Sequence, residues 1–190
     1  MMQFYYLMVP QMVLQTVLMI TNRNKAGMFR GDQGDYDQFN YWLAGLIDGG
    51  FYFNESGVVS FELTLDSKDE ATLYFIINIL GYGNVGKRTG VNAHRIRTAE
   101  TLCVIDLLKR VNGKLLTIDK QIQLRNVCSH YNIPCIIPSF MDSLSIIRNT
   151  AWLSGFFDAE GSLIIFNEVT LVMSIPQKNI VGPKVFYRLF

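Results

Sequence analysis

The chain has 190 residues, long enough for one large domain or two small ones, and its net charge is +1. Hydrophobic residues make up 49% and aromatic residues 13%, which excludes a chain that is disordered throughout. The three cysteines form no C-x-x-C pair and the two histidines have no metal-ligand spacing. These patterns favour reduced thiols and argue against a zinc site or a disulfide framework.

The small net charge hides an uneven distribution along the chain. Residues 82–125 contain nine basic and three acidic residues, a local charge of +6, so the rest of the chain sums to −5. Such asymmetry indicates a surface for polyanions, with nucleic acid as the leading candidate. The basic residues are Lys87, Arg88, Arg95, Arg97, Lys109, Arg110, Lys114, Lys120 and Arg125.

The N-terminal 38 residues are expected to be an apolar extension followed by a linker. Residues 1–20 contain no charged residue, which is compatible with a packed apolar helix, a partner-binding segment or a membrane span. Pro10 and several polar residues interrupt this stretch, and no positive region precedes it as in a signal peptide. Residues 21–38 are polar and rich in Gly, Asp and Asn, which is typical of a linker.

From residue 39 the pattern predicts a helix, two strands, a helix, two strands and a helix, up to about residue 111. Residues 58–65 alternate strictly between apolar and polar, as expected for a half-buried strand. Residues 83–89 and 92–98 form a second hairpin, and the four strands predict an α+β fold with one uncovered sheet face. That face should carry Ser60, Glu62, Thr64, Arg95 and Arg97, and Lys87 and Arg88 add positive charge to the second hairpin.

The remaining chain begins the same series of elements again. A helix is expected over residues 115–131 and a linker over 134–150. Residues 151–190 then repeat the motif helix and its first hairpin, but the second hairpin and final helix are missing. We therefore divide the chain into residues 1–38, a first repeat at 39–133, the linker 134–150 and a partial second repeat at 151–190.

Two copies of one motif, 110 residues apart, organise this repeat. The first copy reads Leu43-Ala44-Gly45-Leu46-Ile47-Asp48-Gly49-Gly50-Phe51. The second reads Leu153-Ser154-Gly155-Phe156-Phe157-Asp158-Ala159-Glu160-Gly161. From about residue 39 to its end, the sequence resembles the LAGLIDADG family of homing endonucleases and group I intron maturases in their two-repeat, single-chain form. The resemblance implies an αββαββα repeat with a saddle-shaped antiparallel sheet.

The resemblance also implies roles for individual motif residues. The small residues Gly45, Gly49, Gly155 and Ala159 would let the two motif helices pack closely. In the family the eighth motif positions carry the carboxylates that hold magnesium, and the sixth positions, here Asp48 and Asp158, are expected to be structural. Glu160 occupies the eighth position of the second copy, whereas Gly50 stands there in the first. One half-site is thus expected to be competent to bind metal and the other to have lost its acid.

Lys120 resembles the basic residue near the catalytic pocket of relatives, with Lys114 as the alternative, and either could equally be a solvated lysine. Two functions remain open, besides a translated remnant without function. The first is a catalytically impaired RNA-binding protein, such as an intron maturase or a component of an organellar ribosome or other ribonucleoprotein. The second is a magnesium-dependent DNA endonuclease or nickase, which a second polypeptide could complete. The family resemblance also suggests a mitochondrial location, in the matrix.

Overall fold

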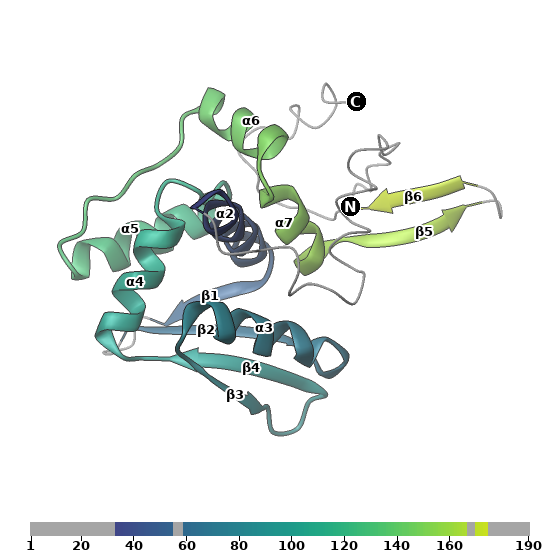
Figure 1. The fold of residues 1–190 in the computed structure, drawn as a ribbon, viewed down its shortest axis with the longest axis horizontal. Helices are drawn as coiled ribbons and strands as arrows, with labels where there is room; N and C mark the ends of the chain where they lie inside the picture. The colour runs from purple at the N-terminus through teal and green to yellow at the C-terminus, as the bar shows by residue number, and fades with distance from the viewer. Residues whose placement is uncertain (1–32, 55–58, 167–169, 175–190) are drawn as a thin grey trace.

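The computed structural model describes residues 33–54, 59–166 and 170–174 (Figure 1). The apolar segment 1–20 and most of the expected linker lie outside these residues. Within them, no helix is long and apolar enough to cross a membrane.

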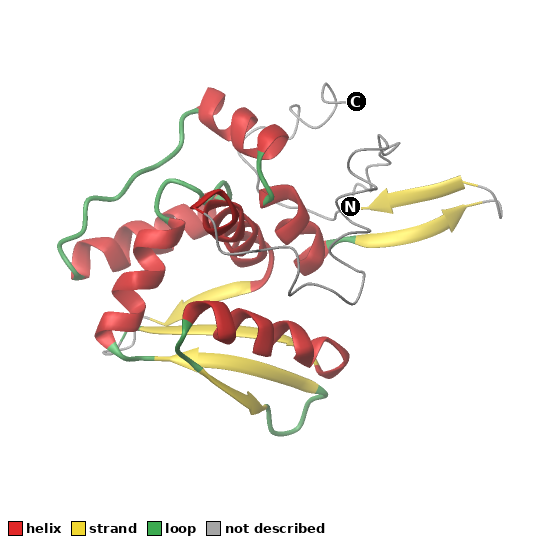
Figure 2. Ribbon diagram, viewed as in Figure 1, coloured by secondary structure: helices red, strands yellow, loops and turns green. Residues whose placement is uncertain are grey.

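The first repeat contains the predicted series of elements in the predicted order. Helix α2 (Gln33–Gly50) is followed by strands β1 (Phe51–Asn54) and β2 (Ser60–Asp66). After a short 3-10 turn come helix α3 (Glu70–Leu80), strands β3 (Asn84–Lys87) and β4 (Ala93–Thr98) and helix α4 (Thr101–Val111). The LAGLIDADG-type αββαββα arrangement and the α+β class predicted from sequence are therefore confirmed (Figure 2).

The first repeat forms a four-stranded antiparallel sheet in the order β1-β2-β4-β3. In the pairing of β2 with β4, Glu62 lies opposite Arg97 and Thr64 opposite Arg95. Because side chains alternate along a strand, these polar residues share one face, while Leu63 lies on the other. Helix α3 packs on β2, β3 and β4 and covers this apolar face (Figure 1).

The remaining described elements are three helices and a third hairpin. They are α5 (Ile118–His130), α6 (Phe140–Asn149), α7 (Trp152–Glu160), β5 (Ser162–Phe166) and β6 (Thr170–Ser174). Strands β5 and β6 pair with each other in a separate two-stranded sheet. Helices α2 and α7 lie side by side at the centre of the molecule, and the β5–β6 hairpin extends away from the four-stranded sheet (Figure 1).

Two boundaries predicted from sequence were wrong. Helix α2 begins at Gln33, so residues 33–38 are helical and not linker. The side chain of Gln38, within these residues, accepts a hydrogen bond of 2.8 Å from the backbone N–H of Ala151. The expected linker 134–150 contains α6, whose capping box joins Ser139 and Asp142.

The motif helices provide the centre of the hydrophobic core. In α2, Leu43, Leu46 and Ile47 are buried, and in α7 Trp152 and Phe156 are fully buried with their rings stacked at 4.8 Å between centroids. Both helices are apolar on several sides, which fits their position between the sheet and the other helices. This packing brings the C-terminal ends of the two motif copies together.

Candidate nucleic-acid site at the motif helices

Helices α2 and α7 touch through their backbones at one glycine from each copy. A Cβ atom added to Gly45 would collide with the carbonyl oxygen of Trp152, and one added to Gly155 would collide with that of Trp42. Farther along, a Cβ on Gly49 would overlap the Cβ of Ala159. The four small residues of the motif therefore all lie in the contact between the helices.

Each motif tryptophan donates a hydrogen bond to the sixth-position acid of the other copy. Trp42 Nε1 lies 2.9 Å from Asp158 Oδ2, and Trp152 Nε1 lies 3.0 Å from Asp48 Oδ2. The two bonds cross the helix contact in opposite directions. These tryptophan roles were not predicted from sequence, although both residues stand directly before the first motif leucine and this shared position could have indicated a common role.

Asp48 carries further contacts to the segment that precedes α5. Its Oδ2 accepts the backbone N–H of Leu116 at 2.7 Å, and its Oδ1 accepts the hydroxyl of Thr117 at 2.7 Å and the Thr117 N–H at 3.2 Å. Burial raises the pKa of Asp48 from 3.8 to about 6, although these bonds and the one from Trp152 lower it. Asp48 is thus a buried structural carboxylate.

Glu160, the eighth-position acid of the second copy, lies at the end of α7 against the end of α2. A Cβ added to Gly49 would come within 3.1 Å of Glu160 Cγ. Gly50 is the last residue of α2, so the place of the missing acid is a backbone without a side chain. Burial raises the pKa of Glu160, and the positive charge of Lys120 opposes that shift.

Lys120 comes from the first turn of α5 and is half-buried in the same region. Burial lowers the pKa of Lys120, while the charges of Asp48, Asp119 and Glu160 raise it. The structure thus places Glu160 against the end of α2 that carries Gly50, and the charges of Lys120 and Glu160 act on each other. Lys114 lies elsewhere, with Nζ 5.0 Å from the centre of the Tyr41 ring, so it is a cation–π partner of α2.

The side chains at the ends of the two motif helices do not fit the magnesium site with paired carboxylates that the resemblance implies. Among the described residues, no three His, Cys, Asp or Glu side chains are grouped to hold a metal ion. Glu160 is the one acid at the eighth motif positions, and the neighbouring Lys120 ammonium repels a divalent cation. Asp48 cannot substitute, because its oxygens accept four hydrogen bonds.

The polar sheet face contains an internal ion pair. Arg95 Nη1 lies 3.1 Å from Glu62 Oε2 and 3.2 Å from Oε1, and both side chains are half-exposed. Thr64 is half-exposed beside them, and Arg97 is exposed. The prediction that Ser60 is available on the polar sheet face was wrong, because Ser60 is only 2% exposed and so cannot contact a nucleic acid. The alternation of side chains along a strand assigns each residue to one face of the sheet, but it does not show which residues are covered at the end of the strand.

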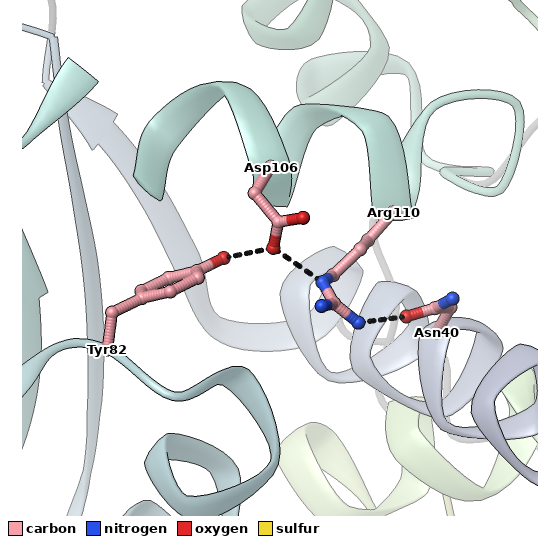
Figure 3. A network of polar contacts seen from close by, with 4 residues as sticks. All are labelled: Asn40, Tyr82, Asp106 and Arg110. Carbon is pink, nitrogen blue, oxygen red and sulfur yellow. Dashed lines mark hydrogen bonds and ion pairs between the residues drawn. The ribbon is translucent and has the colours of Figure 1, made fainter. Parts of the chain in front are cut away.

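Other basic residues divide into exposed and internally bonded ones. Lys87 and Arg88 are exposed at the tip of the β3–β4 hairpin. Arg110, in contrast, donates 2.6 Å and 3.4 Å hydrogen bonds to Asp106 Oδ2 and Asn40 Oδ1 (Figure 3). The Tyr82 hydroxyl donates to the same Asp106 oxygen at 2.9 Å. Part of the positive charge predicted from sequence therefore stabilises the fold.

Two motif copies that meet through paired helices, packed with a four-stranded antiparallel sheet, define the class of protein as a LAGLIDADG-type fold. Curated relatives agree with this class. The chain is 38% identical over 128 residues to "Intron-encoded RNA maturase bI4" of Saccharomyces cerevisiae, covering 66% of this chain and 19% of that protein. It is 35% identical over 129 residues to "Probable intron-encoded endonuclease aI2" of Debaryomyces hansenii, covering 67% of this chain and 19% of that protein.

The chain belongs to the LAGLIDADG family of intron-encoded endonucleases and maturases. It spans about a fifth of the length of these two relatives. No protein-family model matches the chain. The solved LAGLIDADG homing endonuclease I-LtrWI bound to target DNA is similar at a TM-score of 0.46 and 15% identity, covering 68% of this chain and 60% of that one. That similarity is too low to contribute to the assignment, which rests on the motif and the sequence relatives.

Proposed function

We propose that this protein binds RNA as a catalytically impaired LAGLIDADG protein, acting as an intron maturase or as a scaffold in an organellar ribonucleoprotein. The observation that carries the proposal is the motif itself: the helix contact is complete, but glycine replaces the acid at Gly50. Binding requires the architecture and the basic surface, whereas cleavage of both strands requires both carboxylates.

The exposed cations of the sheet support this function. Arg97 on the polar face and Lys87 and Arg88 at the hairpin tip are available for phosphate contacts. Contacts of this kind give an affinity that falls as salt is added. The relative at 38% identity is named as an RNA maturase, which favours RNA over DNA as the partner. A mitochondrial location, in the matrix, is part of the same proposal, since one relative in Schizosaccharomyces pombe is named as a cox1 intron protein.

The test begins with the nucleic acid that the protein carries. RNA crosslinked to the full chain by ultraviolet light is sequenced, and the recovered RNA becomes the binding probe. We expect salt-sensitive binding that is unchanged in Glu160→Gln and weakened in the Arg95→Ala/Arg97→Ala double variant. Arg148→Ala, an exposed arginine on α6 away from the sheet, is the matched control. Absence of bound RNA, or binding that salt does not weaken, would overturn the proposal.

A second candidate is a magnesium-dependent DNA endonuclease or nickase. The observation that favours it is Glu160, which is retained at the end of α7 beside Lys120. A second polypeptide that completes the second repeat could supply what the described residues lack. A library of DNA target sites is incubated with the protein and magnesium, and nicking that Glu160→Gln abolishes would support this function. If no target is cut, even after Gly50→Asp and Phe51→Gly are introduced together, this candidate fails.

A further inference from the structure

The start of α5 is fixed by a side chain from a distant element. The residue before the helix, Thr117, makes no side-chain capping bond within α5. Its hydroxyl instead donates to Asp48 Oδ1 at 2.7 Å, and the backbone N–H groups of Leu116 and Thr117 also donate to this carboxylate. The fourth donor is Trp152 from α7. One carboxylate therefore joins α2, α7 and the N-terminus of α5.

This junction determines where Lys120 lies. Lys120 is three residues after Thr117, in the first turn of α5, so a shift of the helix start moves its side chain directly. The same turn is held by Gln121, whose Nε2 donates to the carbonyl of Leu115 at 2.9 Å. The acids whose charges act on the pKa of Lys120 are Asp48, Asp119 and Glu160.

We propose that Asp48 is a positioning residue that holds Lys120 beside Glu160 by anchoring the N-terminus of α5. The four hydrogen bonds to one buried carboxylate fix the helix in position and in rotation. Asp48, the sixth-position acid of the first copy, thus has a role beyond the end of its own helix. It sets the position of Lys120, which comes from another part of the chain.

The positioning role is tested on the protein alone by a zero-length carbodiimide crosslink between the Lys120 amine and the Glu160 carboxylate, identified by peptide mass spectrometry. The wild-type chain should form this crosslink. Thr117→Val leaves Asp48 charged but removes the hydroxyl donor. We expect the crosslink yield to fall, because loss of one hydrogen bond to a charged group lowers the ratio of anchored to released helix starts by about tenfold.

Two further variants separate positioning from general packing. Thr117→Ser keeps the hydroxyl and should restore the crosslink. Trp152→Phe removes a donor from the same carboxylate on the α7 side and should retain the crosslink, because the three bonds to the α5 start remain. Asp48→Asn should lose it, with circular dichroism used to verify folding. A wild-type chain without the crosslink, or a folded Thr117→Val chain with an unchanged yield, overturns the proposal.

A second experiment measures RNA binding. It rests on the proposed function, because it treats Lys120 as a phosphate contact. Lys120→Gln and Thr117→Val should each lower the slope of RNA affinity against salt by about one phosphate contact. Their effects should not add in the double variant, because both remove the same contact. Additive effects would contradict positioning. If no RNA binds, the proposed function fails, and the crosslink still decides whether Asp48 positions Lys120.

Discussion

The indole N–H of Trp42 donates a hydrogen bond of 2.9 Å to the carboxylate of Asp158 across the contact between the two repeats. The reverse bond runs from Trp152 to Asp48 at 3.0 Å. The two repeats are therefore held together by reciprocal polar contacts as well as by close packing of their glycines. Both kinds of contact depend on residues that recur 110 positions apart.

Loss of the Trp42 bond should weaken the contact between the repeats. Trp42→Phe keeps an aromatic ring but removes the indole N–H. We expect the free energy of unfolding to fall by about 2 kcal/mol, as for other hydrogen bonds to charged groups. Urea denaturation followed by circular dichroism measures the change. A loss within about 0.5 kcal/mol, typical of an unimportant surface change, would show that the bond contributes little.

The glycine contact should tolerate no side chain. Gly155→Ala places a Cβ against the carbonyl oxygen of Trp42, which is backbone and cannot move away without separating the helices. We expect a loss of stability of about 3 kcal/mol or more. Gly86→Ala in β3 is the control, because a Cβ there meets nothing within 4 Å. Equal effects of the two substitutions on the urea midpoint would contradict close packing at Gly155.

Asp48 should make stability depend on pH. Burial raises its pKa in the folded chain from 3.8 to about 6, so the folded state holds this proton more tightly than the unfolded state. Its contribution to stability is fully present below about pH 4 and is lost as the pH rises through 6, by at most about 3 kcal/mol.

The measurement is the free energy of unfolding of wild type and Asp48→Asn between about pH 3 and pH 7, a range that includes both pKa values of Asp48, 3.8 and about 6, with a margin of about one unit at each end. The wild type should lose stability across this window, and the variant should lose markedly less. Parallel curves for the two chains would show that Asp48 does not titrate there.

The two arginines of the sheet face should contribute unequally to RNA binding. Arg97 is exposed, whereas Arg95 must first leave Glu62, to which it is already bound at 3.1 Å. Arg97→Ala should therefore weaken binding by about tenfold and lower the salt slope by about one, with a smaller effect for Arg95→Ala. Filter binding at several salt concentrations measures both. A larger loss for Arg95→Ala would mean that its pair with Glu62 opens in the complex.

The network around Asp106 should matter for stability and not for RNA binding (Figure 3). Asp106→Ala removes the acceptor shared by Tyr82 and Arg110 and leaves two half-buried donors without it. We expect a loss of about 2 kcal/mol in unfolding free energy. Arg125→Ala, an exposed residue, should change stability by less than about 0.5 kcal/mol. A similar loss in both variants would contradict a specific network.

Local patterns predicted most of the elements but not all of them, and they were poor for the limits of the elements. Strict alternation over residues 58–65 correctly predicted β2, and the hairpin expected over residues 83–89 and 92–98 is present as β3–β4. Helix α2 begins earlier than predicted, and within the added residues Gln38 contacts Ala151 in the second repeat, a bond that no local pattern contains. Helix α6 was missed even though its capping box is local.

The sequence by itself determined the repeat, the family and the absence of an acid at Gly50, because each is a matter of residue type and spacing. Only the tertiary structure decided which charges are available. Arg95 is bound to Glu62 on the neighbouring strand, because folding brings these distant side chains to within 3.1 Å, and Lys120 is half-buried where the charge of Glu160 acts on it. The tertiary structure also made Asp48 the point where three helices meet.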